Sequence, residues 1–155
     1  MEKVQLKWKV LNTWAEIPKY MSQGASGFDF RACLMDHPNT QLLIQPGETV
    51  CVPTGLAVEI PEGAEIQIRP RSGISMKTKL RLPNTPGTID SDYRGEVGIL
   101  MENTSVLEVA VIKHGERIAQ GVVAPVIRVE HILSDVLSTT TRGENGFGKS
   151  PEEGY

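Results

Sequence analysis

The stretch GLAVEIPEGAEIQIR, residues 55–69, decides the fold of this chain. It holds two short apolar-rich runs, 55–60 and 64–69, on either side of Pro-Glu-Gly at 61–63. Apolar side chains at every second position are typical of a half-buried β-strand, and proline and glycine favour a tight turn between strands. The stretch therefore predicts two consecutive strands joined by a turn.

Similar runs recur along the chain between glycines and prolines. Further strands are expected at residues 4–10, 48–52, 96–102, 106–112, 117–125 and 126–132. The sequence has no long amphipathic helix, and its best helix is a short one over residues 72–79, with Ser72 as the N-cap. Many short strands separated by turns predict an all-β fold, a closed or double-sheet structure such as a jelly roll, with one short helix.

Length and composition exclude several classes of protein. The 155 residues suit one compact domain, which at this size buries about 70% of its unfolded surface. A balance of 16 basic and 19 acidic residues argues against a general binder of nucleic acid or of an anionic membrane. No apolar run approaches the ~20 residues of a membrane helix, and the N-terminus lacks the apolar core of a signal peptide. Cys33 and Cys51 have no paired spacing, which suggests reduced thiols and a cytoplasmic location.

The composition changes after Leu137, where the chain becomes polar and rich in glycine. We therefore expect a β domain at residues 1–137 and a flexible C-terminal arm at residues 138–155. Residues 143–150, GENGFGKS, match the phosphate-binding pattern G-x-x-x-x-G-K-[ST]. That pattern needs a buried strand before it and a helix after it, and neither fits here, so a P-loop fold is rejected.

The local chemistry of this arm survives the rejection. Glycine amides together with Arg142, Lys149 and Ser150 can wrap a polyphosphate if the arm folds over one. Taken alone, the segment is explained more simply as an ordinary disordered terminus.

A second candidate for anion binding is Arg71-Ser72-Gly73, which follows an expected strand and opens the short helix. Free amides at a helix N-terminus, a serine hydroxyl and an arginine that binds phosphate through two donors all favour an anion here. A capped helix beside a surface arginine is the simpler explanation of this tripeptide by itself.

Residues 82–96, LPNTPGTIDSDYRGE, carry the most chemistry. Turn residues at both ends of a short strand suggest a hairpin that brings Asp90 and Asp92 close together. A fixed carboxylate could deprotonate a water for attack on phosphorus, and Tyr93 could stack on a base or sugar. An acidic turn that only solvates a loop is the alternative.

Two further segments place polar groups beside expected core strands: ASGFDFRA at 25–32, with Asp29, and GERIAQ at 115–120, with Arg117 and Gln120. A core strand after a turn explains most of each pattern. The three histidines lack metal-ligand spacing, and no Ser/His/Asp or Cys/His arrangement is evident.

Taken in order, five segments closely resemble the five motifs of the trimeric deoxyuridine triphosphatase (dUTPase) family. They are residues 25–30, 71–74, 87–95, 115–120 and 142–148, and the resemblance runs from about residue 3 to residue 150. It implies a jelly-roll-like β-barrel that assembles as a homotrimer with active sites at the subunit interfaces. The reaction would be hydrolysis of dUTP to dUMP and pyrophosphate, with Mg2+ bound to the triphosphate. This activity would keep uracil out of DNA and supply dUMP for thymidylate synthesis.

The resemblance also implies a role for each matched residue. Asp90 would be the general base that activates the water attacking the α-phosphorus, and Asp29 would be an acid near the metal and phosphates. Tyr93 would pack under the deoxyribose and exclude a 2′-hydroxyl. The phosphates would be held by Arg71, Ser72, Gly73 and Gln120. The uracil edge would be read by Asn84, Gly87, Thr88, Ile89 and Gly98. From the arm, Phe147 would stack on uracil while Arg142, Gly148, Lys149 and Ser150 close on the γ-phosphate.

The fifth motif departs from the family pattern, which usually continues Gly-Phe-Gly-Ser-Thr-Gly. Here Lys149 replaces a hydroxyl by an ammonium, and Pro151 lacks a backbone donor. Two alternatives stay open: a dCTP deaminase, which shares this fold, and a regulatory protein that binds the nucleotide without turnover.

Overall fold

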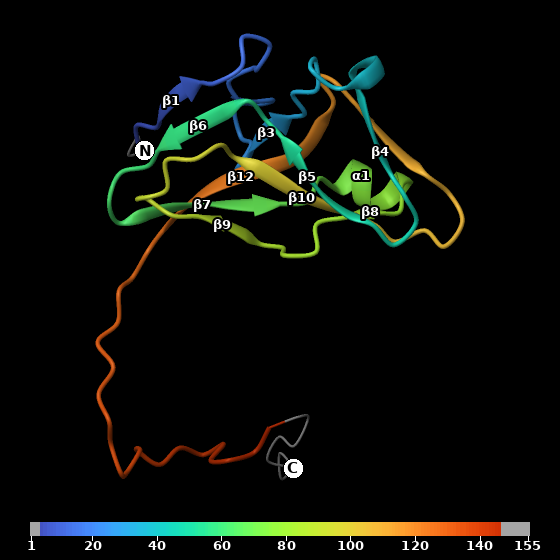
Figure 1. Ribbon diagram of the computed structural model, residues 1–155. Coiled ribbons are helices and arrows are strands. Elements are labelled where there is room, and N and C mark those ends of the chain that lie inside the picture. The colour runs from blue at the N-terminus through green and yellow to red at the C-terminus, as the bar shows by residue number, and fades with distance from the viewer. Residues whose placement is uncertain (1–3, 147–155) are drawn as a thin grey trace.

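In the computed structural model, which describes residues 4–146, the chain is built almost entirely of short strands (Figure 1). The described part contains one α-helix, α1 (Ser72–Lys77), and a short 3-10 turn, η1 (Pro38–Thr40). The strands are β1 (Lys7–Val10), β2 (Lys19–Tyr20), β3 (Phe28–Arg31), β4 (Gln41–Ile44), β5 (Thr49–Pro53), β6 (Leu56–Glu59), β7 (Ala64–Arg69), β8 (Leu80–Arg81), β9 (Gly87–Ile89), β10 (Gly98–Asn103), β11 (Ala110–Lys113) and β12 (Arg117–Pro125).

The strands pair antiparallel in a jelly-roll-like β fold. The largest sheet has the order β2-β3-β12-β7-β9, a second has the order β5-β10-β8, and β1-β6 and β4-β11 form pairs. Strands adjacent in space are mostly distant in sequence, as for β3, β12 and β7 in Figure 1. This arrangement brings the segments around residues 29, 71 and 120 to one region of the largest sheet.

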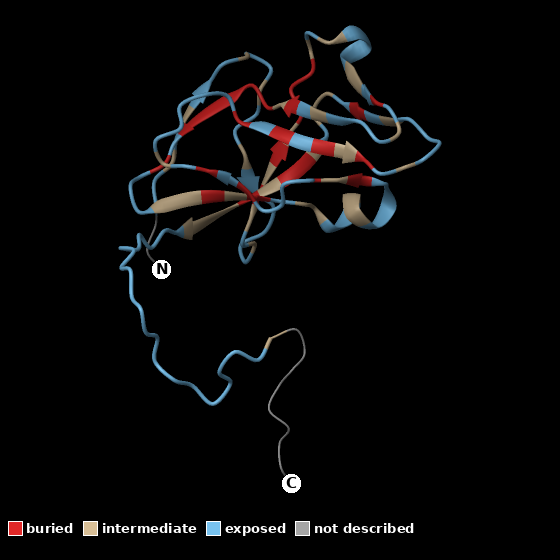
Figure 2. Cartoon of the chain, turned by 60° about the horizontal axis from the view of Figure 1, so that its bottom comes forward, coloured by how far each residue is buried: buried red, intermediate tan, exposed pale blue. Residues whose placement is uncertain are grey.

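The core lies between the sheets and is filled by alternating side chains (Figure 2). On β3, Phe28 and Phe30 are buried while Asp29 faces the other side of the sheet. Their rings pack edge-on against Trp8, with centroids 6.1 and 5.9 Å away. A Cβ on Gly121 would stand 2.6 Å from the Phe28 ring and 2.8 Å from the Phe30 ring, so this position in β12 has no room for a side chain.

The strands expected at 64–69 and 117–125 are found with the same bounds, and those at 4–10, 48–52, 55–60 and 96–102 are found with shifted ends. The prediction was wrong at residues 126–132, which form no strand although their pattern alternates. The strand at 106–112 is limited to Ala110–Lys113, because residues 104–109 form an exposed loop.

The helix begins one residue earlier than its predicted cap, Ser72, implies. Arg71 is the N-cap, because its carbonyl accepts the N–H groups of Ile74 and Ser75 at 3.1 Å each. Ser72 is thus the first helical residue, and its side chain makes no capping hydrogen bond. With Arg71 as the N-cap, Ser72 and Gly73 lie in the first turn, where backbone N–H groups have no acceptor within the helix.

Beyond Pro125, the part of the chain described to residue 146 contains neither helix nor strand. Val126 is still attached through its N–H to the Gly63 carbonyl at 2.9 Å, and the chain then extends away from the sheets (Figure 1). Most of its apolar side chains are fully open to solvent, including Leu133 at 97% exposure (Figure 2). Among residues 4–146, no helix is long and apolar enough to cross a membrane.

Candidate active site

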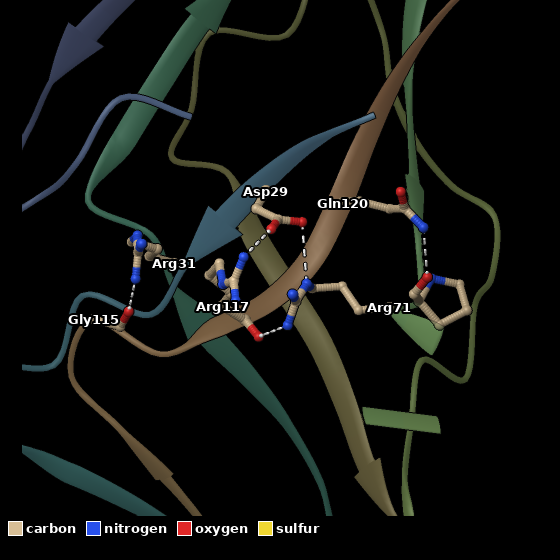
Figure 3. A network of polar contacts seen from close by, with 7 residues as sticks. Asp29, Arg31, Arg71, Gly115, Arg117 and Gln120 are labelled. Atoms are coloured by element: carbon tan, nitrogen blue, oxygen red, sulfur yellow. Dashed lines mark hydrogen bonds and ion pairs between the residues drawn. The ribbon is translucent and has the colours of Figure 1, made fainter. Parts of the chain in front are cut away.

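One group of the predicted site residues is centred on a carboxylate that lies between two arginines (Figure 3). Asp29 Oδ1 accepts from Arg71 Nε, and Asp29 Oδ2 accepts from Arg117 Nη1, both at 3.1 Å. Arg71 Nη1 also donates to the Arg117 carbonyl at 3.1 Å. The Asp29 side chain is largely buried, at 14% exposure, so the ion pairs are shielded from solvent. Two guanidinium groups and one carboxylate leave a net positive charge here.

The first turn of α1 lies next to this charge. Gln120 on β12 donates from Nε2 to the Pro70 carbonyl at 3.0 Å, which fixes the backbone immediately before Arg71. A Cβ on Gly73 would meet nothing within 4 Å, so the first turn of α1 is open on the side of this residue. Arg71, Ser72, Gly73 and Gln120 are thus brought together as predicted, in an arrangement of cations and amide donors suited to phosphate oxygens.

The loop from β8 to β9 brings a second group of predicted residues together. A Cβ on Gly87 would stand 3.1 Å from Asn84 Nδ2, so the exposed amide of Asn84 lies directly over the glycine backbone. The Thr85–Pro86 peptide bond between them is cis. Within β9, Thr88 is exposed and Ile89 is buried. Gly98 begins β10, and a side chain there would overlap Cys51 Sγ.

The expected hairpin at residues 82–96 is wrong in its pairing. Strand β9 pairs with β7, whereas β10 belongs to a different sheet, beside β5 and β8. The intervening turn is closed by the Tyr93 N–H on the Asp90 carbonyl at 3.2 Å. Tyr93 Oη donates to the Glu96 carbonyl at 2.9 Å, which lays the ring over Gly95.

Asp90 and Asp92 do lie close together, in a cleft of about 830 Å³. Its lining carries five carboxylates and two arginines: Glu59, Glu62, Glu65, Asp90, Asp92, Arg94 and Arg128. This excess of negative charge repels a triphosphate. The Asp90 cleft therefore needs cations from elsewhere before it can hold a nucleotide.

Within residues 4–146, the Arg71 cluster does not lie beside this cleft. Ile89, which precedes Asp90, pairs with Ile66, whereas Gln120 pairs with Arg69. Three residues along β7 span about 10 Å, and β9 and β12 on its two sides are also about 10 Å apart. Asp90 and the Arg71 cluster thus form two separate halves.

Both cysteines are unsuited to nucleophilic chemistry. Burial raises the pKa of the Cys33 thiol and of the Cys51 thiol, and the Glu96 carboxylate raises both further. The thiols are therefore protonated at neutral pH, and the thiolate is the reactive form.

Of the predicted arm residues, only Arg142 lies in the described part of the chain. It is exposed, and its Nε donates to the Asn145 carbonyl at 2.8 Å. Phe147, Gly148, Lys149 and Ser150 lie outside the described residues.

Sequence reasoning did not assign roles to Arg117 or Gly27. A Cβ on Gly27 would stand 2.7 Å from Gln120 Oε1, so this glycine makes room for the Gln120 amide. Arg117 could have been found from its place in GERIAQ, where a charge enters an apolar strand. Its pairing with Asp29, which is 88 residues away in the sequence, could not have been found in this way.

No group of three or more His, Cys, Asp or Glu side chains in residues 4–146 could hold a metal ion. Asp29 has both oxygens engaged by arginines. The side chains described here therefore fit a metal that arrives on phosphate oxygens, as Mg2+ commonly does.

Comparisons with known proteins point to one family. The family model of dUTPase matches residues 13–151. A deoxyuridine 5'-triphosphate nucleotidohydrolase of Roseobacter denitrificans is 48% identical over 148 residues, covering 95% of each chain. Another of the same name from Nautilia profundicola is 49% identical and covers 95% of this chain and 99% of its own.

Solved structures give the same result. The dUTPase of Staphylococcus bacteriophage 80alpha, solved with dUpNHpp, aligns with a TM-score of 0.79 and 29% identity over 95% of this chain and 98% of its own. A mutant dUTPase from phage phi11 of S. aureus, described as coordinating a structural Mg(II) ion, aligns with a TM-score of 0.74 and 25% identity. That alignment covers 85% of this chain and 97% of the phage chain.

Proposed function

The chain belongs to the dUTPase family, and from this premise we propose that it hydrolyses dUTP to dUMP and pyrophosphate with Asp90 as the general base. The observation that carries the assignment of the site is the division of the matched residues into two halves. One half is cationic and rich in amide donors around Arg71, and the other is acidic and contains Asp90. A phosphate-binding element and a base for water are the two parts that this hydrolysis needs.

The two halves come together when copies of the chain associate. We take the assembly to be a homotrimer, as the resemblance to the trimeric dUTPases implies. Two features support association. The acidic Asp90 cleft requires cations from another copy, and residues 126–137 expose apolar side chains that a lone chain leaves in water. A closed ring of identical copies gives every site one half from each of two neighbours.

In the proposed step, the Asp90 carboxylate accepts a proton from a water whose oxygen forms the new bond to the α-phosphorus. The bond from that phosphorus to the α,β-bridging oxygen breaks, and pyrophosphate leaves with the electron pair. Arg71, the amides of Ser72 and Gly73, and Gln120 hold the phosphates in line and stabilise the charge on them.

Base and sugar are selected by the segment around β9. The Asn84 amide over the Gly87 backbone, with Thr88, Ile89 and the backbone of Gly98, supplies donors and acceptors for a uracil edge. Neither Gly87 nor Gly98 has room for a side chain, because an added Cβ would press on Asn84 Nδ2 at the first position and overlap Cys51 Sγ at the second. The Tyr93 ring, fixed through Glu96, packs under the deoxyribose and excludes a 2′-hydroxyl.

A Mg2+ ion bound to the triphosphate oxygens would neutralise part of their charge. Arg142, Phe147, Gly148, Lys149 and Ser150 of the arm close over the bound nucleotide, with Phe147 on the base and the others on the γ-phosphate. Closure excludes water other than the nucleophile.

The test is pyrophosphate release with Mg2+ across dUTP, dTTP, dCTP and UTP, with ammonia release from dCTP measured in parallel. Selective hydrolysis of dUTP supports the proposal. Ammonia from dCTP would instead indicate a deaminase, and tight dUTP binding without turnover would indicate a regulatory protein. An Asp90→Asn variant should keep its oligomeric state and bind dUTP while turnover falls by about 10³-fold or more.

A further inference from the structure

We infer that Arg117 is a positioning residue for phosphate binding, which through Asp29 and its own carbonyl holds the Arg71 guanidinium in a single orientation. The inference rests on the proposed function, because it concerns the half of the site assigned to the triphosphate. It adds a residue to which that proposal gives no role.

The first observation is an irregularity in strand β12. Arg117 pairs with Arg31, but Ala119 pairs with Phe30, so the register shifts by one residue between Arg117 and Ala119. This is the geometry of a β-bulge, in which one strand carries an extra residue.

The bulge decides which way Arg117 points. Side chains of a regular strand alternate between faces, so residues three apart, such as Arg117 and Gln120, would lie on opposite faces. In β12 the consecutive residues Ile118 and Ala119 are both buried, and Arg117 and Gln120 are both on the outer face with Asp29. Without the bulge, Arg117 could not reach Asp29.

The second observation is how fully Arg71 is held. Its Nε is bound by Asp29 and its Nη1 by the Arg117 carbonyl, both at 3.1 Å. Within residues 4–146, no acceptor is found for Arg71 Nη2. The guanidinium plane is therefore fixed by two contacts, and its Nη2 group is left for an anion.

The role of the Arg117 side chain is to hold Asp29 in turn. Its Nη1 occupies Asp29 Oδ2 at 3.1 Å, which leaves Oδ1 for Arg71. It also keeps the group of three side chains net positive, because Asp29 with Arg71 alone would be neutral. Loss of Arg117 should thus weaken phosphate binding and leave uracil recognition, at the other half of the site, unchanged.

The experiment measures two dissociation constants in the presence of Mg2+: that of dUpNHpp, which has the triphosphate, and that of deoxyuridine, which does not. Arg117→Met keeps the length and apolar packing of the side chain and removes its charge. We expect the Kd of dUpNHpp to rise about 10-fold or more, since a charge-assisted contact is lost, and the Kd of deoxyuridine to stay within about 2-fold. Arg117→Lys, which keeps the charge, should recover part of the loss.

Arg31→Met is the matched control. Arg31 is the register partner of Arg117, but its guanidinium contacts Glu16 and the Gly115 carbonyl rather than Asp29 (Figure 3). This variant should bind both ligands like the parent chain. In an Arg71→Met background, Arg117→Met should change the Kd of dUpNHpp by less than about 3-fold, because the group that it positions is gone.

Equal weakening of both ligands by Arg117→Met would overturn the inference, since it would show a general structural effect. An undiminished effect in the Arg71→Met background would overturn it as well, by showing direct contact with phosphate. Should Arg117→Met fail to fold, Arg117→Lys decides between the same outcomes through its smaller, triphosphate-selective loss. A parent chain that neither hydrolyses dUTP nor binds dUpNHpp would contradict the proposed function itself, which separates the two failures.

Discussion

Asp90, which follows β9, and Gln120, which lies on β12, flank opposite ends of the strand between them, β7. Ile89, next to Asp90, pairs with Ile66 near the start of β7, and Gln120 pairs with Arg69 at its end. One chain therefore presents the base on one side and the phosphate-binding group on the other. In the proposed homotrimer, each copy supplies its neighbour with the half of the site that the neighbour lacks.

Association makes a specific prediction for mixed assemblies of two inactive variants. Asp90→Asn chains lack the base and Arg71→Ala chains lack the phosphate-binding arginine, so each alone should be inactive. When equal amounts are co-expressed, a site that draws its base and its arginine from different chains is intact with a probability of about one quarter. Pyrophosphate release should recover to about that fraction of the parent activity.

A mixture prepared without subunit exchange is the control for this experiment and should stay inactive. No recovery after confirmed mixing would show that both groups act within one chain, and the two halves would then have to move toward each other.

Gly95 controls where the Tyr93 ring lies, and its substitution should relax sugar selection. A Cβ at residue 95 would stand 2.6 Å from Tyr93 Cζ, too close for a carbon contact, so Gly95→Ala must displace the ring. We expect the ratio of kcat/KM for dUTP over UTP to fall about 10-fold. Gly24→Ala, where an added Cβ meets nothing within 4 Å, should leave that ratio unchanged. An unaltered ratio in Gly95→Ala would remove Tyr93 from sugar selection.

Local pattern predicted the bounds of β7, whose alternation matches its burial, and of β12, which is a strongly apolar run. The motifs also predicted that Arg71, Ser72, Gly73 and Gln120 lie together. Residues 126–132 show why pattern is insufficient: an alternating segment becomes a strand only beside a partner strand, and the described chain offers it none. The bulge before Ala119 and the divergence of β9 from β10 depend on pairing across distant segments. Neither leaves a signal in neighbouring residues.

Asn103 should be the most costly polar residue to remove from the core. It is 1% exposed, and its Nδ2 donates to the Ile44 and Glu108 carbonyls at 3.0 and 2.7 Å while its Oδ1 accepts from the Ser105 N–H at 3.0 Å. Because this buried side chain loses three hydrogen bonds, Asn103→Ala should lower the free energy of unfolding by about 3 kcal/mol. Urea unfolding at fixed protein concentration measures it. The exposed Lys79→Ala should change that free energy by less than about 0.5 kcal/mol, and an equally small effect of Asn103→Ala would refute the prediction.

Removal of divalent metal should abolish turnover while leaving the fold intact. Residues 4–146 contain no cluster of three metal-ligating side chains, and we therefore expect this part of the chain to stay folded without metal. With EDTA, dUTP hydrolysis should stop and the far-UV circular dichroism should be unchanged, and Mg2+ should restore the activity. Full turnover in excess EDTA would contradict a role for Mg2+ on the triphosphate.

The arm should be dispensable for folding and required for turnover. Within residues 4–146, all of the buried core precedes Pro125. A chain that ends at Thr141 therefore keeps the packing of the sheets, and it also keeps the apolar residues 126–137. Without Arg142 and the residues after it, nothing closes on the γ-phosphate, and we expect kcat to fall about 100-fold at an unchanged oligomeric mass. A chain that ends at Ser150 retains the whole fifth motif and should turn over dUTP like the parent. Equal activity of the two truncated chains would assign closure of the site to some other segment.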